Sequence, residues 1–231
     1  MQAQQADAAD QTSPSPDLPE LPLVLLIVKT SGSNNGFTEF ALPQSVVRRI
    51  PVYALKLNKA LEKAGSSRAC VTDNIIRRKE VVIQAVEYLA YGKLKTLDVG
   101  NWGQCFDTLT ELIYLYDFGV TLSIDELQHA VVDHITECDG LAPDMFVHFA
   151  AECYREGKGH KITPDCLLGQ FIKKNLGLHL PGLVESGAVN DIKEVGGTLN
   201  KQLVEVFTDF YMAQMKSKIP KDEEVKTEVK D

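Results

Sequence analysis

The apolar run LPLVLLIV, from Leu21 to Val28, is the feature that most constrains how this chain can fold. A transmembrane helix needs about 20 apolar residues, so the run is too short to span a bilayer. Asp17 and Glu20 precede it, where a secretory signal carries positive charge. Its Val and Ile content and the Lys29 that ends it predict a buried β-strand. We therefore expect no membrane segment and an intracellular protein, either cytoplasmic or nuclear.

The residues after this run predict a hairpin. Asn35-Gly36 is a strong turn signal, and residues 37–42 return as a second strand that Pro43 ends. Alternation along that strand places Phe37 and Phe40 on opposite faces. Further short elements are expected as helices over residues 44–50 and 52–63 and as a third strand over 69–72.

Apolar residues at helical spacing predict helices over most of the remaining chain. The first has a stripe from Val81 to Leu89 and ends at Gly92, which is typical of a left-handed C′ residue. The others are expected over residues 103–117, from a Ser123/Glu126 capping box to Ile135, after Pro143, from Thr163-Pro164 to a glycine-rich stretch at Gly177, and from Thr198.

Strands that come first and helices that follow indicate an α+β fold with a helical second half. Composition divides the chain into four parts. Residues 1–20 lack core-forming side chains and 216–231 alternate lysine with acidic residues, so both are expected to be disordered. A first folded part over residues 21–137 and a helical extension over 138–215 lie between them.

The overall charge disfavours a nucleic-acid partner. The formal net charge is -8, whereas a general electrostatic binder of nucleic acid is usually basic. The densest basic cluster is Arg77, Arg78 and Lys79, at the start of an expected helix. Three charges at such a position are typical of a solvated face.

Patterns that indicate catalysis or metal binding are weak. Wide spacing and the absence of a C-x-x-C pair predict reduced thiols and no zinc site for the five cysteines: Cys70, Cys105, Cys138, Cys153 and Cys166. Even Cys153, His160 and Cys166 form no close pair, and Cys153 is expected in the core. We expect no catalytic residue, no cofactor and no metal.

The tyrosines and two of the histidines are interpreted structurally. Tyr88 and Tyr91 lie at a helix end and are expected to be half-buried packing residues, since no base is visible nearby in the sequence. His134 shares the apolar stripe of its helix and is expected in the core. His129, five residues earlier, is expected to face solvent.

Three stretches, in order and spacing, resemble a BTB/POZ domain of a divergent, fungal type. The resemblance covers about Leu21 to Ile135 and identifies the part 21–137 as BTB/POZ-like. It implies a scaffold of short strands and helices that binds proteins, often itself, and has no active site. The stretches are FALPQSVVRRIPVYA (Phe40 to Ala54), VEYLAYGKL (Val86 to Leu94) and LIYLYDFGVTLSIDELQHAVVDHI (Leu112 to Ile135).

The resemblance implies an adaptor or regulatory scaffold that works through protein partners. The alternative is a substrate adaptor of a cullin-type ubiquitin ligase, with the target bound by the C-terminal helices. The loop SSRACVTDN lacks the acidic pattern that the family uses toward cullins, which argues against this alternative. An enzyme whose site no pattern reveals is the least favoured reading.

In the family the first strand and first helix form the usual pairing surface, which here spans residues 21–50. An apolar patch shared by two copies would favour a two-fold homodimer. If the helix Thr198 to Met212 covers the patch instead, Arg48 and Arg49 would form a solvated rim around it. The candidate interaction surface consists of Phe37, Phe40, Val46, Val47, Arg48, Arg49 and Ile50.

Overall fold

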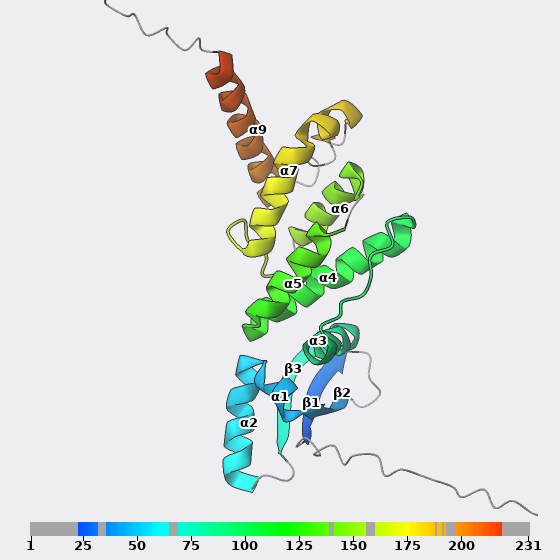
Figure 1. Ribbon diagram of the computed structural model, residues 1–231, viewed down its shortest axis with the longest axis vertical. Coiled ribbons are helices and arrows are strands. Elements are labelled where there is room, and N and C mark those ends of the chain that lie inside the picture. The colour runs from blue at the N-terminus through cyan, green and yellow to red at the C-terminus, as the bar shows by residue number, and fades with distance from the viewer. Residues whose placement is uncertain are drawn as a thin grey trace, which may run out of the picture.

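The computed structural model describes residues 23–31, 36–64, 69–138, 141–155, 160–187, 189–190, 192 and 197–218. Strands come first in these residues and helices follow, so the α+β prediction is confirmed. The molecule is elongated, with the sheet at one end and the last helices at the other (Figure 1). Residues 1–20 lie outside the described part, and of 216–231 only 216–218 are described, as the end of a helix.

The sheet has three strands in the order β2-β1-β3. They are β1 (Leu23–Ser31), β2 (Phe37–Pro43) and β3 (Cys70–Arg78). β1 is central, antiparallel to β2 and parallel to β3. The apolar run therefore forms a strand, as predicted, but only one of its faces is fully buried, the face that carries Val24, Leu26 and Val28.

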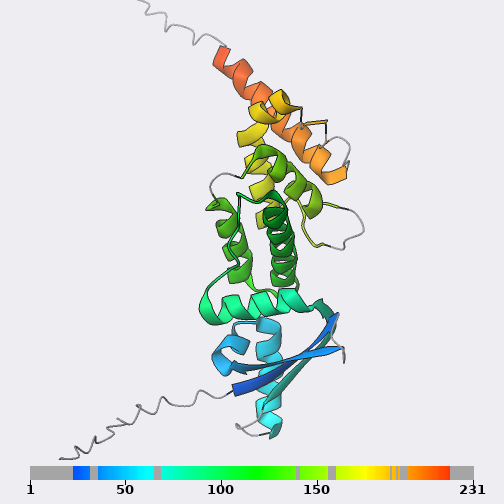
Figure 2. The ribbon, with the colours of Figure 1, turned by 90° about the vertical axis from the view of Figure 1, so that its right-hand side faces the viewer.

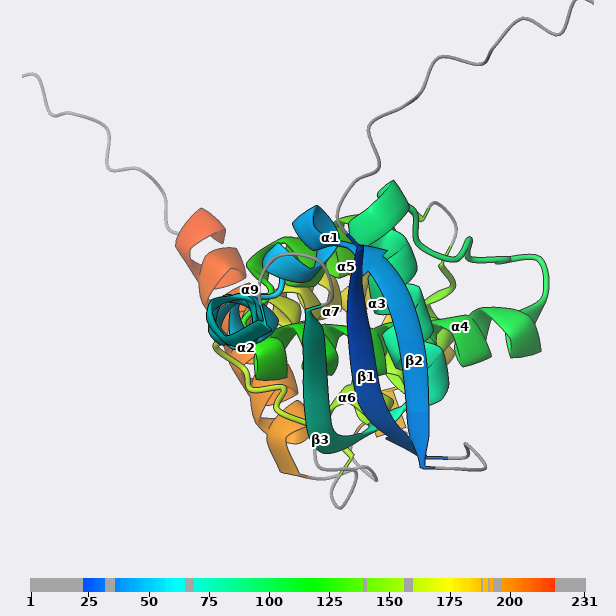
Figure 3. The same cartoon turned by 90° about the horizontal axis from the view of Figure 1, so that it is seen from below.

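Helices cover one face of the sheet. α1 and α3 pack against the strands on this face. Seen from below, the other face of the sheet points toward the viewer, and most of the helices lie behind the sheet (Figure 3). The helices are α1 (Gln44–Arg48), α2 (Pro51–Ala64), α3 (Lys79–Tyr91), α4 (Trp102–Leu122), α5 (Asp125–Thr136), α6 (Pro143–Cys153), α7 (Leu167–Ser186) and α9 (Gly197–Lys218).

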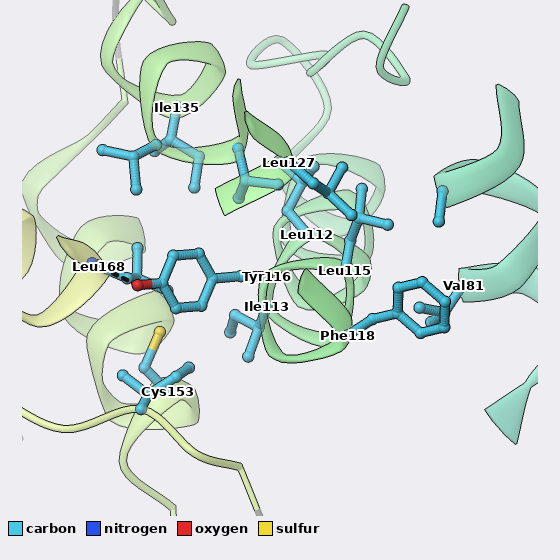
Figure 4. Packing of buried hydrophobic residues seen from close by; sticks show 14 of the residues in the cluster. Val81, Leu112, Ile113, Leu115, Tyr116, Phe118, Leu127, Ile135, Cys153 and Leu168 are labelled. Carbon is cyan, nitrogen blue, oxygen red and sulfur yellow. Dashed lines mark hydrogen bonds between the residues drawn. The ribbon is translucent and has the colours of Figure 1, made fainter. Parts of the chain in front are cut away.

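One hydrophobic cluster extends from β1 to α9. α4 contacts α3, α5 and α6, and α5 also contacts α7. In the middle of this cluster the Tyr116 hydroxyl accepts a hydrogen bond from the backbone N–H of Leu168 at 3.2 Å (Figure 4). The parts expected at 21–137 and 138–215 therefore pack through a continuous core.

The capping box predicted at Ser123 is wrong. Ser123 adopts φ 56° and ends α4, which runs further than expected, while Ile124 precedes α5 without a side-chain cap. Glu126 instead pairs with Arg49. A Ser-x-x-Glu pattern cannot distinguish a helix start from a left-handed helix end, because short polar residues suit both positions.

The limits predicted for α7 are also wrong at both ends. The helix begins after Cys166, whose Sγ accepts the N–H of Gly169 at 3.4 Å, and not at Thr163. It then continues past Gly177 and Pro181 to Ser186. The buried apolar stripe explains the continuation, because it runs from Leu176 past the glycine to Leu180 and Leu183.

Gly92 ends α3 as predicted. It adopts φ 69°, and its N–H donates to the Tyr88 carbonyl at 2.7 Å. A β-branched residue is strained at positive φ, so we expect Gly92→Val to lower the free energy of unfolding by about 1 kcal/mol or more. Gly92→Asn is the control and should cost less, because asparagine tolerates this conformation. Equal urea midpoints for wild type and Gly92→Val would contradict the prediction.

Candidate interaction surfaces

The apolar residues predicted for an exposed pairing surface are buried. Val46, Val47 and Ile50 are 7%, 0% and 1% exposed, so the prediction is wrong for all three. α1 has five residues, and Ile50 lies in the turn that directly follows it, with its N–H bonded to the Val47 carbonyl. Positions i, i+1 and i+4 share one side of a helical turn, and here that side faces the core.

Arg48 and Arg49 of the predicted surface are exposed, but the Arg49 side chain is held by hydrogen bonds and is not simply solvated. Its Nε and Nη2 donate to the two carboxylate oxygens of Glu126 at 2.9 and 2.7 Å, and Nη1 contacts the Leu89 carbonyl. This bidentate pair ties α1 to α5. Residues 198–212 do not cover this region, since they lie in α9, which packs against α7 at the other end of the molecule (Figure 1).

The outer sheet face is open, and its apolar residues, by which we define it, are Leu23, Leu25, Ile27, Phe37 and Ala41; Lys29 and exposed Glu39 lie among them. Antiparallel register places Leu25 opposite Ala41, Ile27 opposite Glu39, and Lys29 opposite Phe37 on this face. Leu25 and Phe37 are 38% and 41% exposed, while Phe40 on the other face is half-buried. The opposite placement of the two phenylalanines is as predicted, and the continuous apolar run reflects a strand that is apolar on both faces.

The second open apolar surface is the α7/α9 groove, with a volume of about 420 Å³. Leu199, Leu203 and Val206 of α9 pack into the core, and α9 then extends beyond the end of α7 in both views (Figure 1, Figure 2). The residues that line the α7/α9 groove are Leu180, Pro181, Val184, Glu185, Phe207, Phe210 and Tyr211.

The groove leaves large apolar side chains in contact with solvent. Val184, Phe210 and Tyr211 are 53%, 43% and 62% exposed. Helical spacing predicts the apolar stripe of α9 but does not reveal where α7 ends, so it does not show that α7 leaves the last turns of this stripe uncovered.

The basic cluster is not a uniformly solvated face. β3 reaches Arg78, and the side chain of Arg77 is only 11% exposed, so the prediction is wrong for Arg77. Its Nε lies 3.5 Å from Oδ2 of buried Asp73, which also accepts a 2.7 Å hydrogen bond from the Tyr53 hydroxyl. Burial and this bond raise the pKa of Tyr53.

The tyrosines at the end of α3 differ in environment. Tyr88 is half-buried, as predicted, and its hydroxyl donates to the Glu126 carbonyl at 3.4 Å. Tyr91 is 76% exposed, so the prediction of a half-buried residue is wrong there. Gly92 breaks the helix directly after it, which leaves Tyr91 beyond the last packed turn.

Among the described residues, the contacts of the histidines and cysteines do not form a catalytic pair or triad. His129 is exposed, as predicted, but His134 is half-buried and its Nε2 lies 2.9 Å from the Lys95 carbonyl oxygen. Cys153 is in the core, as predicted, and burial raises the pKa of its thiol. Among the described residues no group of three His, Cys, Asp or Glu side chains is placed to hold a metal.

None of the described helices combines the length and apolar character needed to span a bilayer. No protein-family model matches the chain, and no curated protein sequence matches it. The candidate surfaces are therefore defined by their own geometry.

Proposed function

We propose that this chain is a protein-interaction module, an adaptor or regulatory scaffold of BTB/POZ type, which binds a partner protein in the α7/α9 groove. The observation that carries the proposal is the exposure of Val184, Phe210 and Tyr211 around one apolar groove. Exposed apolar patches mark contact sites, and aromatic side chains supply much of the energy of protein interfaces.

The placement of the resembling stretches supports the BTB/POZ part of the proposal. Residues 40–54 run from the end of β2 through α1 into α2, and residues 86–94 contain the end of α3 at Gly92. Residues 112–135 belong to the helix pair α4 and α5. The resemblance implies elements of these kinds in this order, and their agreement is what supports this part of the proposal.

The shape and chemistry of the groove favour an amphipathic helix as the bound element. Two helices form its walls, and a third helix would lie between them with its apolar face inward. Helix walls offer side chains and no free strand edge, so main-chain pairing with an extended peptide is not available there. Glu185 in the lining would pair with a basic residue beside the apolar face of the partner.

Matched variants on α9 test the groove. A photoreactive aromatic residue in place of Tyr211, which lines the groove and is 62% exposed, would cross-link a partner in cell extract, and that partner would be purified. Phe210→Ser should then weaken its affinity at least tenfold, because a buried aromatic at an interface is typically worth about 2 kcal/mol. Val204→Ser is the control, since Val204 is 63% exposed and is not part of the groove lining. Equal affinities for both variants would refute the groove as the binding site.

We also propose a two-fold homodimer. Its contact surface would be the outer sheet face, because the apolar residues of the α1 region are buried. Leu23, Leu25 and Phe37 are the exposed apolar residues that support it. We expect Leu25→Asp to give a folded monomer, whereas Val47→Asp should unfold the chain because its side chain is fully buried. Sedimentation with circular dichroism measures both, and a wild-type mass of 25.5 kDa at micromolar concentration would exclude the dimer.

A further inference from the structure

A small polar pocket of about 150 Å³ lies where the end of β3 and the start of α3 meet α4. Phe118 of α4 and Val81 of α3 form its apolar wall, and the two lie near each other in Figure 4. The remaining lining residues are polar or charged: Arg77, Arg78, Tyr114 and Asp117. We call it the arginine pocket.

Arg77 has unused donors in a buried position. Its Nε and Nη2 are buried and have no hydrogen-bond partner among the described residues, and the 3.5 Å approach of Nε to Asp73 is an ion pair without hydrogen-bond geometry. The guanidinium lies over the Phe118 ring, 5.6 Å from its centroid, which fixes its position. These two nitrogens are shielded from the pocket, so Arg77 contributes positive charge at the pocket wall, and direct hydrogen bonds to a ligand would come mainly from Arg78.

Arg78 is held in place by Tyr114, one turn before Phe118 on α4. Its guanidinium carbon lies 3.6 Å from the centroid of the Tyr114 ring, and its Nη2 donates to the Tyr114 hydroxyl at 2.9 Å. A guanidinium has five N–H groups, so this bond leaves donor capacity for a ligand. Stacking holds the plane of the group, which reduces the entropy lost when a planar anion binds.

We infer that the arginine pocket binds a single carboxylate group through Arg77 and Arg78. Planar guanidinium groups match carboxylates in bidentate geometry. The volume suits a group of a few atoms and is below the range of pockets for drug-sized ligands. The carboxylate belongs to a peptide or to a free organic acid, and this site is independent of the α7/α9 groove.

The local charge selects a monoanion. Asp117 lines the pocket, and its Oδ1 accepts the backbone N–H of Lys161 at 2.7 Å. Behind Arg77, Asp73 also lies 3.8 Å from Lys56. The cationic side chains of this set are those of Arg77, Arg78 and Lys56, and its carboxylates are those of Asp73 and Asp117. Their sum is one net positive charge. A carboxylate neutralises it, whereas a phosphate dianion would add a charge near Asp117 that nothing in this set compensates.

NMR of the arginine Nε–Hε groups tests the inference on the full chain. Sodium acetate would be titrated at constant ionic strength against sodium chloride. We expect saturable shifts at Arg77 and Arg78 with a Kd on the order of millimolar, as suits a four-atom ligand. Arg78→Gln should weaken binding at least tenfold, while Arg48→Gln, a matched change of an exposed arginine on α1, should leave it unchanged.

Two further measurements make the inference falsifiable. Inorganic phosphate should bind wild type more weakly than acetate, and Asp117→Asn should improve phosphate binding by removing the opposing charge. Shifts that do not saturate, or that chloride reproduces, would overturn the site. Tighter binding of phosphate than of acetate to wild type would overturn the choice of a carboxylate.

Two model compounds identify the source of the carboxylate. N-acetyl-glutamate amide carries only a side-chain carboxylate, and N-acetyl-alanine carries only a terminal one. Tighter binding of either compound than of acetate would support a peptide ligand and name the group that it uses. Binding no tighter than that of acetate would support a free acid, and saturable binding by none of the three would overturn the inference.

Discussion

Replacing Gly169 with alanine should destabilise the fold by about 3 kcal/mol or more, the upper part of the range for overpacked sites. A Cβ at this position would lie 2.0 Å from the Thr163 carbonyl oxygen and 2.8 Å from backbone atoms of Pro164. These are main-chain atoms, so no side-chain rotation can relieve the clash. The first turn of α7 would have to move away from residues 163–164, and Leu168 and Ile172, which lie next to that turn, are fully buried.

A second glycine in the same helix provides the control. A Cβ at Gly182 would meet no atom within 4 Å, so alanine there should stabilise the chain by about 0.5–1 kcal/mol through its higher helix propensity. Urea denaturation of the two variants should therefore give shifts of opposite sign. A Gly169→Ala midpoint at or above that of wild type would show that the contact at the start of α7 does not exist.

Gly169 also shows why sequence patterns located α7 but not its beginning. Thr163-Pro164 has the composition of a helix start, yet these residues form a turn that packs onto the first turn of the helix. The only sign in the sequence of a close approach between two backbone segments is a glycine, and glycine also occurs for many other reasons. The apolar stripe was informative over the interior of the helix because burial of that stripe is what forms it.

The open surfaces were predicted less well than the core. Sequence alternation placed Phe37 and Phe40 on opposite faces, but it could not show that α1 turns its whole apolar side inward, because that depends on the packing of a five-residue helix. The prediction of a solvated face for the basic cluster fails for a related reason. β3 was expected to end at residue 72, whereas it continues to Arg78, so Arg77 enters the fold with the strand.

Loss of the Asp73 carboxylate should have an effect of similar size to that of Gly169→Ala. Asp73 is 3% exposed and accepts hydrogen bonds from the Tyr53 hydroxyl at 2.7 Å and the Ile75 N–H at 3.2 Å. Its Oδ2 also lies 3.5 Å from Nε of Arg77. Removing one partner of a buried pair leaves the other charge uncompensated, so we expect Asp73→Ala to cost about 3–5 kcal/mol.

Two comparisons separate the charge from the packing. Lys56→Met should cost less than about 1 kcal/mol, because Lys56 is 40% exposed and lies 3.8 Å from the carboxylate. Adding Arg77→Met to Asp73→Ala should restore part of the lost stability, since the unpaired guanidinium is then absent from the interior. Chemical denaturation of wild type, Asp73→Ala, Arg77→Met and the double variant measures the coupling between the two positions. If the double variant is no more stable than Asp73→Ala, the loss comes from the hydrogen bonds of Tyr53 and Ile75 and not from the buried charge of Arg77.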